Sequence, residues 1–138
     1  MKALVTGGAG FVGSNLADRL IELGHEVVII DNLSTGKLEN INIKAEFIGK
    51  CLTSLEEDFL IGKGIDVVFH LAALARVQPS IEDPINFNEH NVTATVKLLY
   101  ACHRAKIKRV VYSASSSAYG DATEFPTPET HPINPLSP

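Results

Sequence analysis

A glycine-rich turn, TGGAGFVG at residues 6–13, constrains the fold of this 138-residue chain more than any other segment. The apolar run at residues 2–6 leads into it and predicts a buried strand. Residues 14–23 follow with leucines at helical spacing, and residues 25–30 form a second apolar, β-branched run that ends at Asp31. A strand, a glycine turn, a helix and a second strand within about 30 residues are typical of a parallel βαβ unit. The sequence therefore predicts an α/β fold.

The glycines and the acid of this unit predict a dinucleotide site. Gly7 permits the tight turn, Gly10 lets the backbone approach a pyrophosphate, and Gly13 lets the helix pack closely on the strand. The N–H groups and the dipole at the start of the helix favour a diphosphate there. Asp31 is placed to accept hydrogen bonds from an adenosine ribose, and its charge repels the 2′-phosphate of NADP. We therefore expect NAD as the ligand, although glycine turns also occur in purely structural roles.

The later segments extend this unit into a Rossmann-type doubly wound parallel sheet. Right-handed crossovers give the strand order 3-2-1-4-5. Thr53 and Glu56 have the spacing of a capping box, and Asp83 precedes Pro84 as an N-cap. In chain order we expect a strand at 45–48, a helix at 53–61, a strand at 66–70, a loop at 77–84, a helix at 84–105 and a strand at 108–113. The predicted inner face of the long helix carries Phe87, Asn91, Val92, Thr95, Leu98, Leu99 and Cys102.

Charge, hydropathy and cysteine usage exclude several classes of partner. A net charge of −4 and a pI near 5.7 give no basic surface for nucleic acid. No apolar run is long enough to span a membrane. Cys51 and Cys102 belong to no paired motif. We expect a cytoplasmic protein with reduced cysteines, no bound metal, and neither nucleic acid nor membrane as a partner.

The segment TGGAGFVGSNL, together with IDNLSTG at residues 30–36, resembles the extended short-chain dehydrogenase/reductase family. Within it the chain is most similar to the NAD-dependent nucleotide-sugar epimerases, the group of UDP-glucose 4-epimerase. The resemblance implies NAD as cofactor, a nucleotide sugar as substrate, and removal and return of hydride at C4 of the sugar. The cofactor-binding residues that it implies are Gly7, Gly10, Phe11, Val12, Gly13, Asp31, Asn32, Leu33, Ser34, Thr35, Gly36, Lys50, Cys51, Leu71, Ala72, Ala73, Ala75 and Asn91.

Two stretches of this implied site allow other interpretations. In the epimerases the loop after the second strand wraps the adenosine, but Ser34 and Thr35 are also suited to cap a helix. The third strand is usually followed by Gly-Asp, whose Asp addresses the adenine amino group, whereas this chain has Gly49-Lys50-Cys51. Lysine offers only donors. We therefore expect adenine to pack against Cys51 and to make backbone contacts.

The segment after the fourth strand, His70-Leu71-Ala72-Ala73, matches the family's cofactor-lining segment. Small apolar residues at the end of a strand let a flat cofactor lie across the sheet. For His70 itself we favour a structural role, held by backbone contacts, over catalysis. Asn91 begins a match to the family's Asn-x-x-Gly-Thr, and the resemblance implies that it steadies the cofactor region.

A serine-rich turn follows the fifth strand and holds the candidate catalytic residue. In the epimerases, the serine or threonine four residues before the tyrosine of a Tyr-Gly pair binds the reacting sugar hydroxyl. That position is Ser115, with Ser116 as the second candidate. A dehydratase would carry Thr-Asp-Glu here, so we disfavour an elimination reaction.

The family's catalytic Tyr-x-x-x-Lys pair is missing from these residues. The chain has three tyrosines, and none is followed by a lysine four residues later. We therefore interpret residues 1–120 as an NAD-binding Rossmann domain and residues 121–138 as an extended, proline-rich loop that leads to the missing pair. The chain would be the truncated NAD-binding portion of an epimerase, and inactive by itself because the proton-transfer group is absent.

Two alternatives stay open at this point. One is a module that binds NAD without chemistry, and the other is a parent enzyme that reduces or decarboxylates a nucleotide sugar. A truncated fold would also leave the edge strand at residues 110–112 and part of the long helix bare. We expect a homo-oligomer formed through that helix or that edge.

Overall fold

A five-stranded parallel sheet with the order β3-β2-β1-β4-β5 forms the centre of the molecule, as the computed structural model of the chain shows for residues 1–137. Leu4 of the central strand lies opposite Val28 on one side and Val68 on the other. The predicted fold class and strand order are confirmed. The strands are β1 (Lys2–Thr6), β2 (Glu26–Asp31), β3 (Glu46–Gly49), β4 (Val67–His70) and β5 (Arg109–Tyr112).

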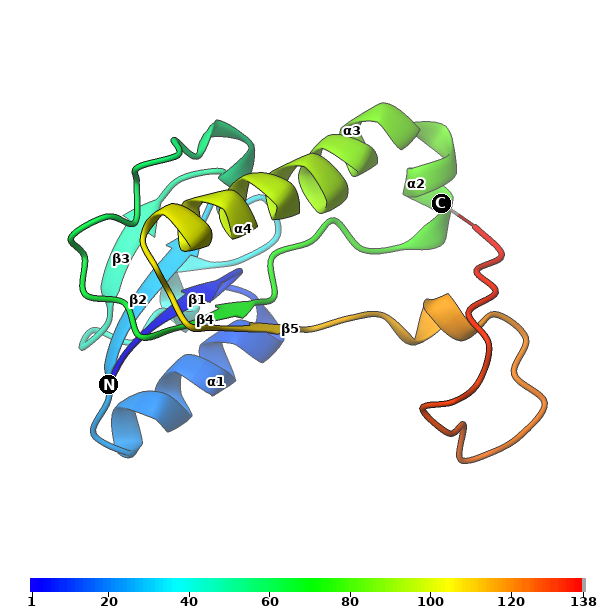
Figure 1. Cartoon of the computed structure of the whole chain (residues 1–138), viewed down its shortest axis with the longest axis horizontal. Helices are drawn as coiled ribbons and strands as arrows, with labels where there is room; N and C mark the ends of the chain where they lie inside the picture. The colour runs from blue at the N-terminus through cyan, green and yellow to red at the C-terminus, as the bar shows by residue number, and fades with distance from the viewer. Residues whose placement is uncertain (138) are drawn as a thin grey trace.

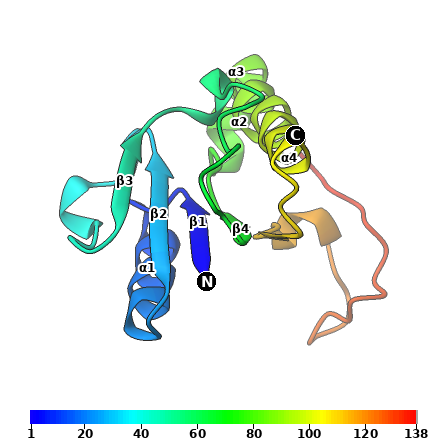
Figure 2. The ribbon, with the colours of Figure 1, turned by 60° about the vertical axis from the view of Figure 1, so that its left-hand side comes forward.

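Helices cover the two faces of this sheet unequally. Figure 1 shows α1 (Phe11–Glu22) on one face and the long run that ends in α4 (Ala94–Arg104) on the other. Figure 2 shows the strands side by side between these layers. Shorter elements are α2 (Val77–Glu82), α3 (Pro84–Asn88), the π-helical turn η3 (Glu89–Thr93) and the 3₁₀ turns η1 (Leu38–Asn40), η2 (Leu52–Ser54) and η4 (Ser116–Tyr119).

The strands supply two separate hydrophobic cores because successive side chains point to opposite faces. Beneath α1 one core joins Ala3, Val5 and Ile29 to the helix. Beneath α4 the other core joins Leu4 and its neighbours on alternate strand positions to Leu98. The central strands are buried on both faces, which is why they read as continuous apolar runs in the sequence.

The predicted helix at residues 53–61 is wrong. The structure has only the single 3₁₀ turn η2 there, followed by irregular turns. The Thr53 hydroxyl donates to Cys51 Sγ at 3.1 Å instead of capping a helix, and Glu56 pairs with Lys50 at 3.8 Å. Leu55 and Leu60 are both buried in the core beneath α4, and their packing there holds the segment in turns and not in a helix.

The segment before the long helix also differs from the prediction. Residues 77–82 form α2 where a loop was expected. The start of the long helix is confirmed, since Asp83 Oδ1 accepts from the Asn86 N–H at 3.2 Å. The helix is nevertheless interrupted by η3, and a π turn changes the phase of the residues after it. Val92, within this turn, and Leu99, after it, are both exposed, although the sequence predicts them on the inner face.

Beyond β5 the chain leaves the sheet. Figure 1 shows this segment, coloured orange to red, running away from the strands. Apart from η4, residues 113–137 contain no helix or strand. In residues 1–137 no helix has the length and apolar character needed to cross a membrane. Apolar side chains including Val96 and Val111 are exposed on α4 and β5, and self-association through them stays a prediction.

Candidate functional site

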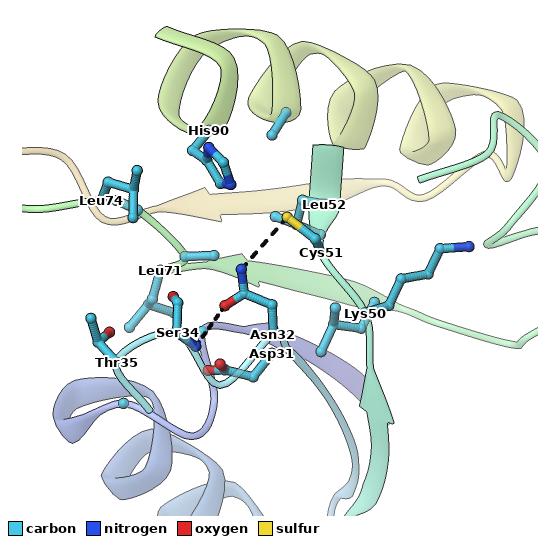
Figure 3. Close-up of a pocket in the computed structure, with 16 residues that line it drawn as sticks. Asp31, Asn32, Ser34, Thr35, Lys50, Cys51, Leu52, Leu71, Leu74 and His90 are labelled. Carbon is cyan, nitrogen blue, oxygen red and sulfur yellow. Dashed lines mark hydrogen bonds between the residues drawn. The ribbon is translucent and has the colours of Figure 1, made fainter. Parts of the chain in front are cut away.

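An open pocket lies at the carboxyl ends of β1, β2 and β4, where a doubly wound sheet ordinarily binds its ligand. The structure brings eleven of the predicted cofactor-binding residues together on this pocket (Figure 3). They are Gly7, Gly10, Asp31, Asn32, Ser34, Thr35, Lys50, Cys51, Leu71, Ala72 and Ala73.

The glycine turn is shaped so tightly that side chains do not fit. Gly7 has a φ of +69°, and a Cβ there would lie 2.9 Å from the backbone of Ala72. A Cβ on Gly13 would lie 2.2 Å from the carbonyl oxygen of Gly7. The N-cap residue of α1 is Gly10, and no side chain caps the helix. The N–H groups of the first turn of a helix have no partner within the helix, so this turn offers donors to an anion.

Asp31 ends β2 beside the turn, and its buried carboxylate is held by two backbone groups. Oδ2 accepts from the Ala9 N–H at 2.9 Å, and Oδ1 accepts from the Leu33 N–H at 2.7 Å. These bonds fix the orientation of the carboxylate. Each oxygen retains a further lone pair for a ligand hydroxyl.

The other predicted residues lie off the pocket. Phe11 and Val12 are exposed at the start of α1. Asn91 supports the wall, because its side chain accepts from the Leu74 N–H at 2.8 Å and donates to the Leu74 carbonyl at 2.9 Å. Also outside the lining are Gly13, Leu33, Gly36, Ala75 and the catalytic candidate Ser115. A ligand role for any of these residues stays a prediction.

Ser115 is the N-cap of η4, and its Oγ accepts from the Ser117 N–H at 3.2 Å. The side chain is exposed, and the hydroxyl proton remains available to a ligand. Ser34 does not cap a helix; its N–H donates to Asn32 Oδ1 at 3.0 Å, and the N-cap of η1 is Lys37. The helix-capping interpretation of the loop at residues 34–35 is therefore wrong.

Buried His70 is structural, but it is held by side-chain hydroxyls and not by the expected backbone contacts. Thr6 Oγ1 accepts from two backbone N–H groups, so its own proton donates to His70 Nδ1 at 2.8 Å. His70 Nε2 then donates to Thr95 Oγ1 at 2.9 Å, and Thr95 donates to the Asn91 carbonyl. Burial lowers the pKa of His70, in agreement with a neutral ring that links β1 and β4 to the long helix.

The two residues after β3 have opposite orientations. Figure 3 shows Lys50 pointing away from the pocket and Cys51 facing it. Lys50 Nζ lies 5.1 Å from the centroid of the Phe59 ring, so the lysine makes its contacts outside the pocket. Burial raises the pKa of the Cys51 thiol, but hydrogen bonds with Thr53 and Asn32, together with the nearby His90 ring when it is charged, outweigh this effect and lower the pKa overall.

Five lining residues were missed by the sequence analysis: Ile30, Leu52, Leu74, His90 and Ala94. His90 is the notable omission because it carries a titratable ring. It enters the pocket from η3, and a π turn in a helix often marks a functional site. The sequence carries no periodic signal for such a turn.

Comparison with known protein families assigns the chain to a family of enzymes. Residues 3–138 match the NAD dependent epimerase/dehydratase family, and the chain belongs to that family. It is 44% identical over 137 residues to the putative UDP-glucose 4-epimerase of Methanocaldococcus jannaschii, with 98% of this chain and 45% of that protein covered.

Solved structures agree with this assignment. The UDP-glucose 4-epimerase of Thermotoga maritima, solved with UDP-glucose, has 38% identity and a TM-score of 0.91 over 99% of this chain and 46% of that chain. The Thermus thermophilus UDP-glucose 4-epimerase, in complex with NAD, has 36% identity and a TM-score of 0.89 over 99% of this chain and 45% of that chain. The chain thus spans about half the length of these relatives.

Proposed function

We propose that this chain binds NAD in the pocket at the carboxyl ends of β1, β2 and β4, as the cofactor-binding portion of a nucleotide-sugar epimerase. The observation that carries the proposal is the glycine cradle beside a fixed carboxylate. A Cβ at Gly7 or Gly13 would clash with backbone, and Asp31 holds its oxygens beside the same turn. A diphosphate fits the start of α1 and a ribose fits Asp31.

The residues of this chain have distinct roles in the proposal. Asp31 binds the adenosine ribose and repels a 2′-phosphate, which favours NAD over NADP. Ala72 and Ala73 leave room for the cofactor to cross the end of β4. Bound NAD supplies a hydride acceptor and donor for chemistry at C4 of the sugar. Ser115, or else Ser116, binds the reacting hydroxyl of the nucleotide sugar.

In the family, the proton-transfer step uses a tyrosine that is followed four residues later by a lysine, and these 138 residues contain no such pair. Tyr119 is followed four residues later by Thr123, and the other two tyrosines are likewise without the lysine. We therefore expect the 138-residue chain alone to bind cofactor without epimerising a sugar. Cytoplasmic location and self-association are further predictions.

The proposal is tested by calorimetric titration of the chain and its Asp31→Ala variant with NAD and NADP. Removing a hydrogen-bonded carboxylate costs about 1.5–3 kcal/mol, so we expect NAD affinity to fall at least about tenfold. Affinity for NADP should fall less or rise, because the charge that repels its 2′-phosphate is gone. This change in the ratio of NAD affinity to NADP affinity distinguishes the loss of a ligand contact from a general loss of structure.

Asp121→Ala is the matched control because Asp121 is an exposed carboxylate outside the pocket. It should bind both dinucleotides like the unmodified chain. No binding of NAD by the unmodified chain, or an unchanged ratio in Asp31→Ala, would refute the proposed site.

A further inference from the structure

The adenine end of the pocket is located by the order of groups in a dinucleotide. With the diphosphate at the start of α1 and the ribose at Asp31, the base comes next, on the side toward β3. This end is lined by Asn32, Cys51, Leu52 and, from the helix layer, His90. Figure 3 shows the His90 ring directed toward the side where Asn32 and Cys51 lie.

The hydrogen bond of His90 determines which of its two ring nitrogens can accept a hydrogen bond from a ligand. Nδ1 lies 3.0 Å from the carbonyl oxygen of Asn86. A carbonyl oxygen only accepts, so Nδ1 carries the proton. In the neutral ring Nε2 is then a lone-pair acceptor, and within residues 1–137 the structure gives it no hydrogen bond.

The other polar side chains at this end are donors, weak acceptors, or acceptors that already hold a hydrogen bond. Lys50 has only donors, and its ammonium group pairs with Glu56 at 3.8 Å. Asn32 Oδ1 already accepts from the Ser34 N–H, and Asn32 Nδ2 donates to Cys51 Sγ at 3.6 Å. Cys51 Sγ, a weak acceptor, is thereby engaged. Among Asn32, Lys50, Cys51 and His90, only the Nε2 atom of His90 is an acceptor to which the structure gives no hydrogen bond within residues 1–137.

We propose that His90 Nε2 accepts a hydrogen bond from the exocyclic amino group of adenine and so sets the preference for an adenine dinucleotide. This inference rests on the proposed function. Adenine presents an N–H donor at this position, whereas hypoxanthine presents a carbonyl oxygen. Two acceptors facing each other repel, and a buried polar group left unpaired is costly.

The test is calorimetric titration of the 138-residue chain with NAD and with nicotinamide hypoxanthine dinucleotide at about pH 8, where imidazoles are ordinarily neutral. We expect NAD to bind about tenfold more tightly, as one good hydrogen bond implies. His90→Phe keeps a ring but no acceptor, so the preference should fall to within about twofold. His90→Gln offers a side-chain carbonyl and should retain part of it.

His103→Phe is the control because His103 is an exposed histidine of α4 outside the pocket, and the preference should be unchanged there. Equal affinity of the unmodified chain for the two dinucleotides, or an undiminished preference in His90→Phe, would overturn the inference and leave NAD binding intact. If the unmodified chain binds neither dinucleotide, the proposed function fails and this inference fails with it.

Discussion

Replacing Gly13 with alanine is expected to destabilise the chain by about 3 kcal/mol or more. The new Cβ would lie 2.2 Å from the Gly7 carbonyl oxygen and 2.8 Å from the Gly8 Cα. Both neighbours are backbone atoms of the turn, so no side-chain rotation relieves the contact. The turn must open or α1 must move away from β1, and both changes disrupt the core beneath α1. Urea unfolding followed by circular dichroism measures the effect.

Gly49→Ala is the matched control at the end of β3. A Cβ there would meet only the Phe47 ring, at 3.5 Å, which is an ordinary contact. Its free energy of unfolding should stay within about 0.5 kcal/mol of the unmodified chain. Equal stability of the Gly13 and Gly49 variants would contradict the close packing of the turn.

Replacing Leu98 with alanine should cost about 2–5 kcal/mol of the free energy of unfolding. Leu98 has 0% of its surface exposed and lies where α4 meets the sheet, in contact with the core that contains Leu4 and Val68. The substitution removes buried apolar atoms and leaves a cavity that neighbouring strands fill only in part. The same urea titration detects the loss as a lower midpoint with a similar slope.

The next residue of the same helix provides the comparison. Leu99 is 46% exposed, so Leu99→Ala removes little buried surface and should cost less than half as much. A larger loss for Leu99 than for Leu98 would mean that α4 presents a different face to the sheet.

The sheet was predictable because its signals are local and strong. The apolar runs at 2–6 and 25–30 flank a glycine turn, and the handedness of crossovers then leaves few strand orders. The residues around Gly7 and Asp31 follow from the same unit. For these residues, the local sequence pattern is sufficient to predict that they line the pocket.

The failures come from segments in which tertiary packing overrides local pattern. Residues 53–61 have the spacing of a capping box, but the leucines at 52, 55 and 60 are buried in the core beneath α4, and the chain takes turns between them. The turn η3 changes the phase of the long helix and brings His90 to the pocket. No periodicity in the sequence signals such a turn, so neither the exposure of Val92 nor the place of His90 was foreseen.

The most direct test of the central claim is an amide chemical-shift titration of the isotopically labelled 138-residue chain with NAD. The proposed site predicts the largest changes at residues 7–13 and 31–36, with further changes around Cys51 and His90. Residues 121–137, which lie outside the pocket, should not respond. Absence of any shift change at high NAD concentration, or changes confined to β5 and the segment beyond it, would contradict the account.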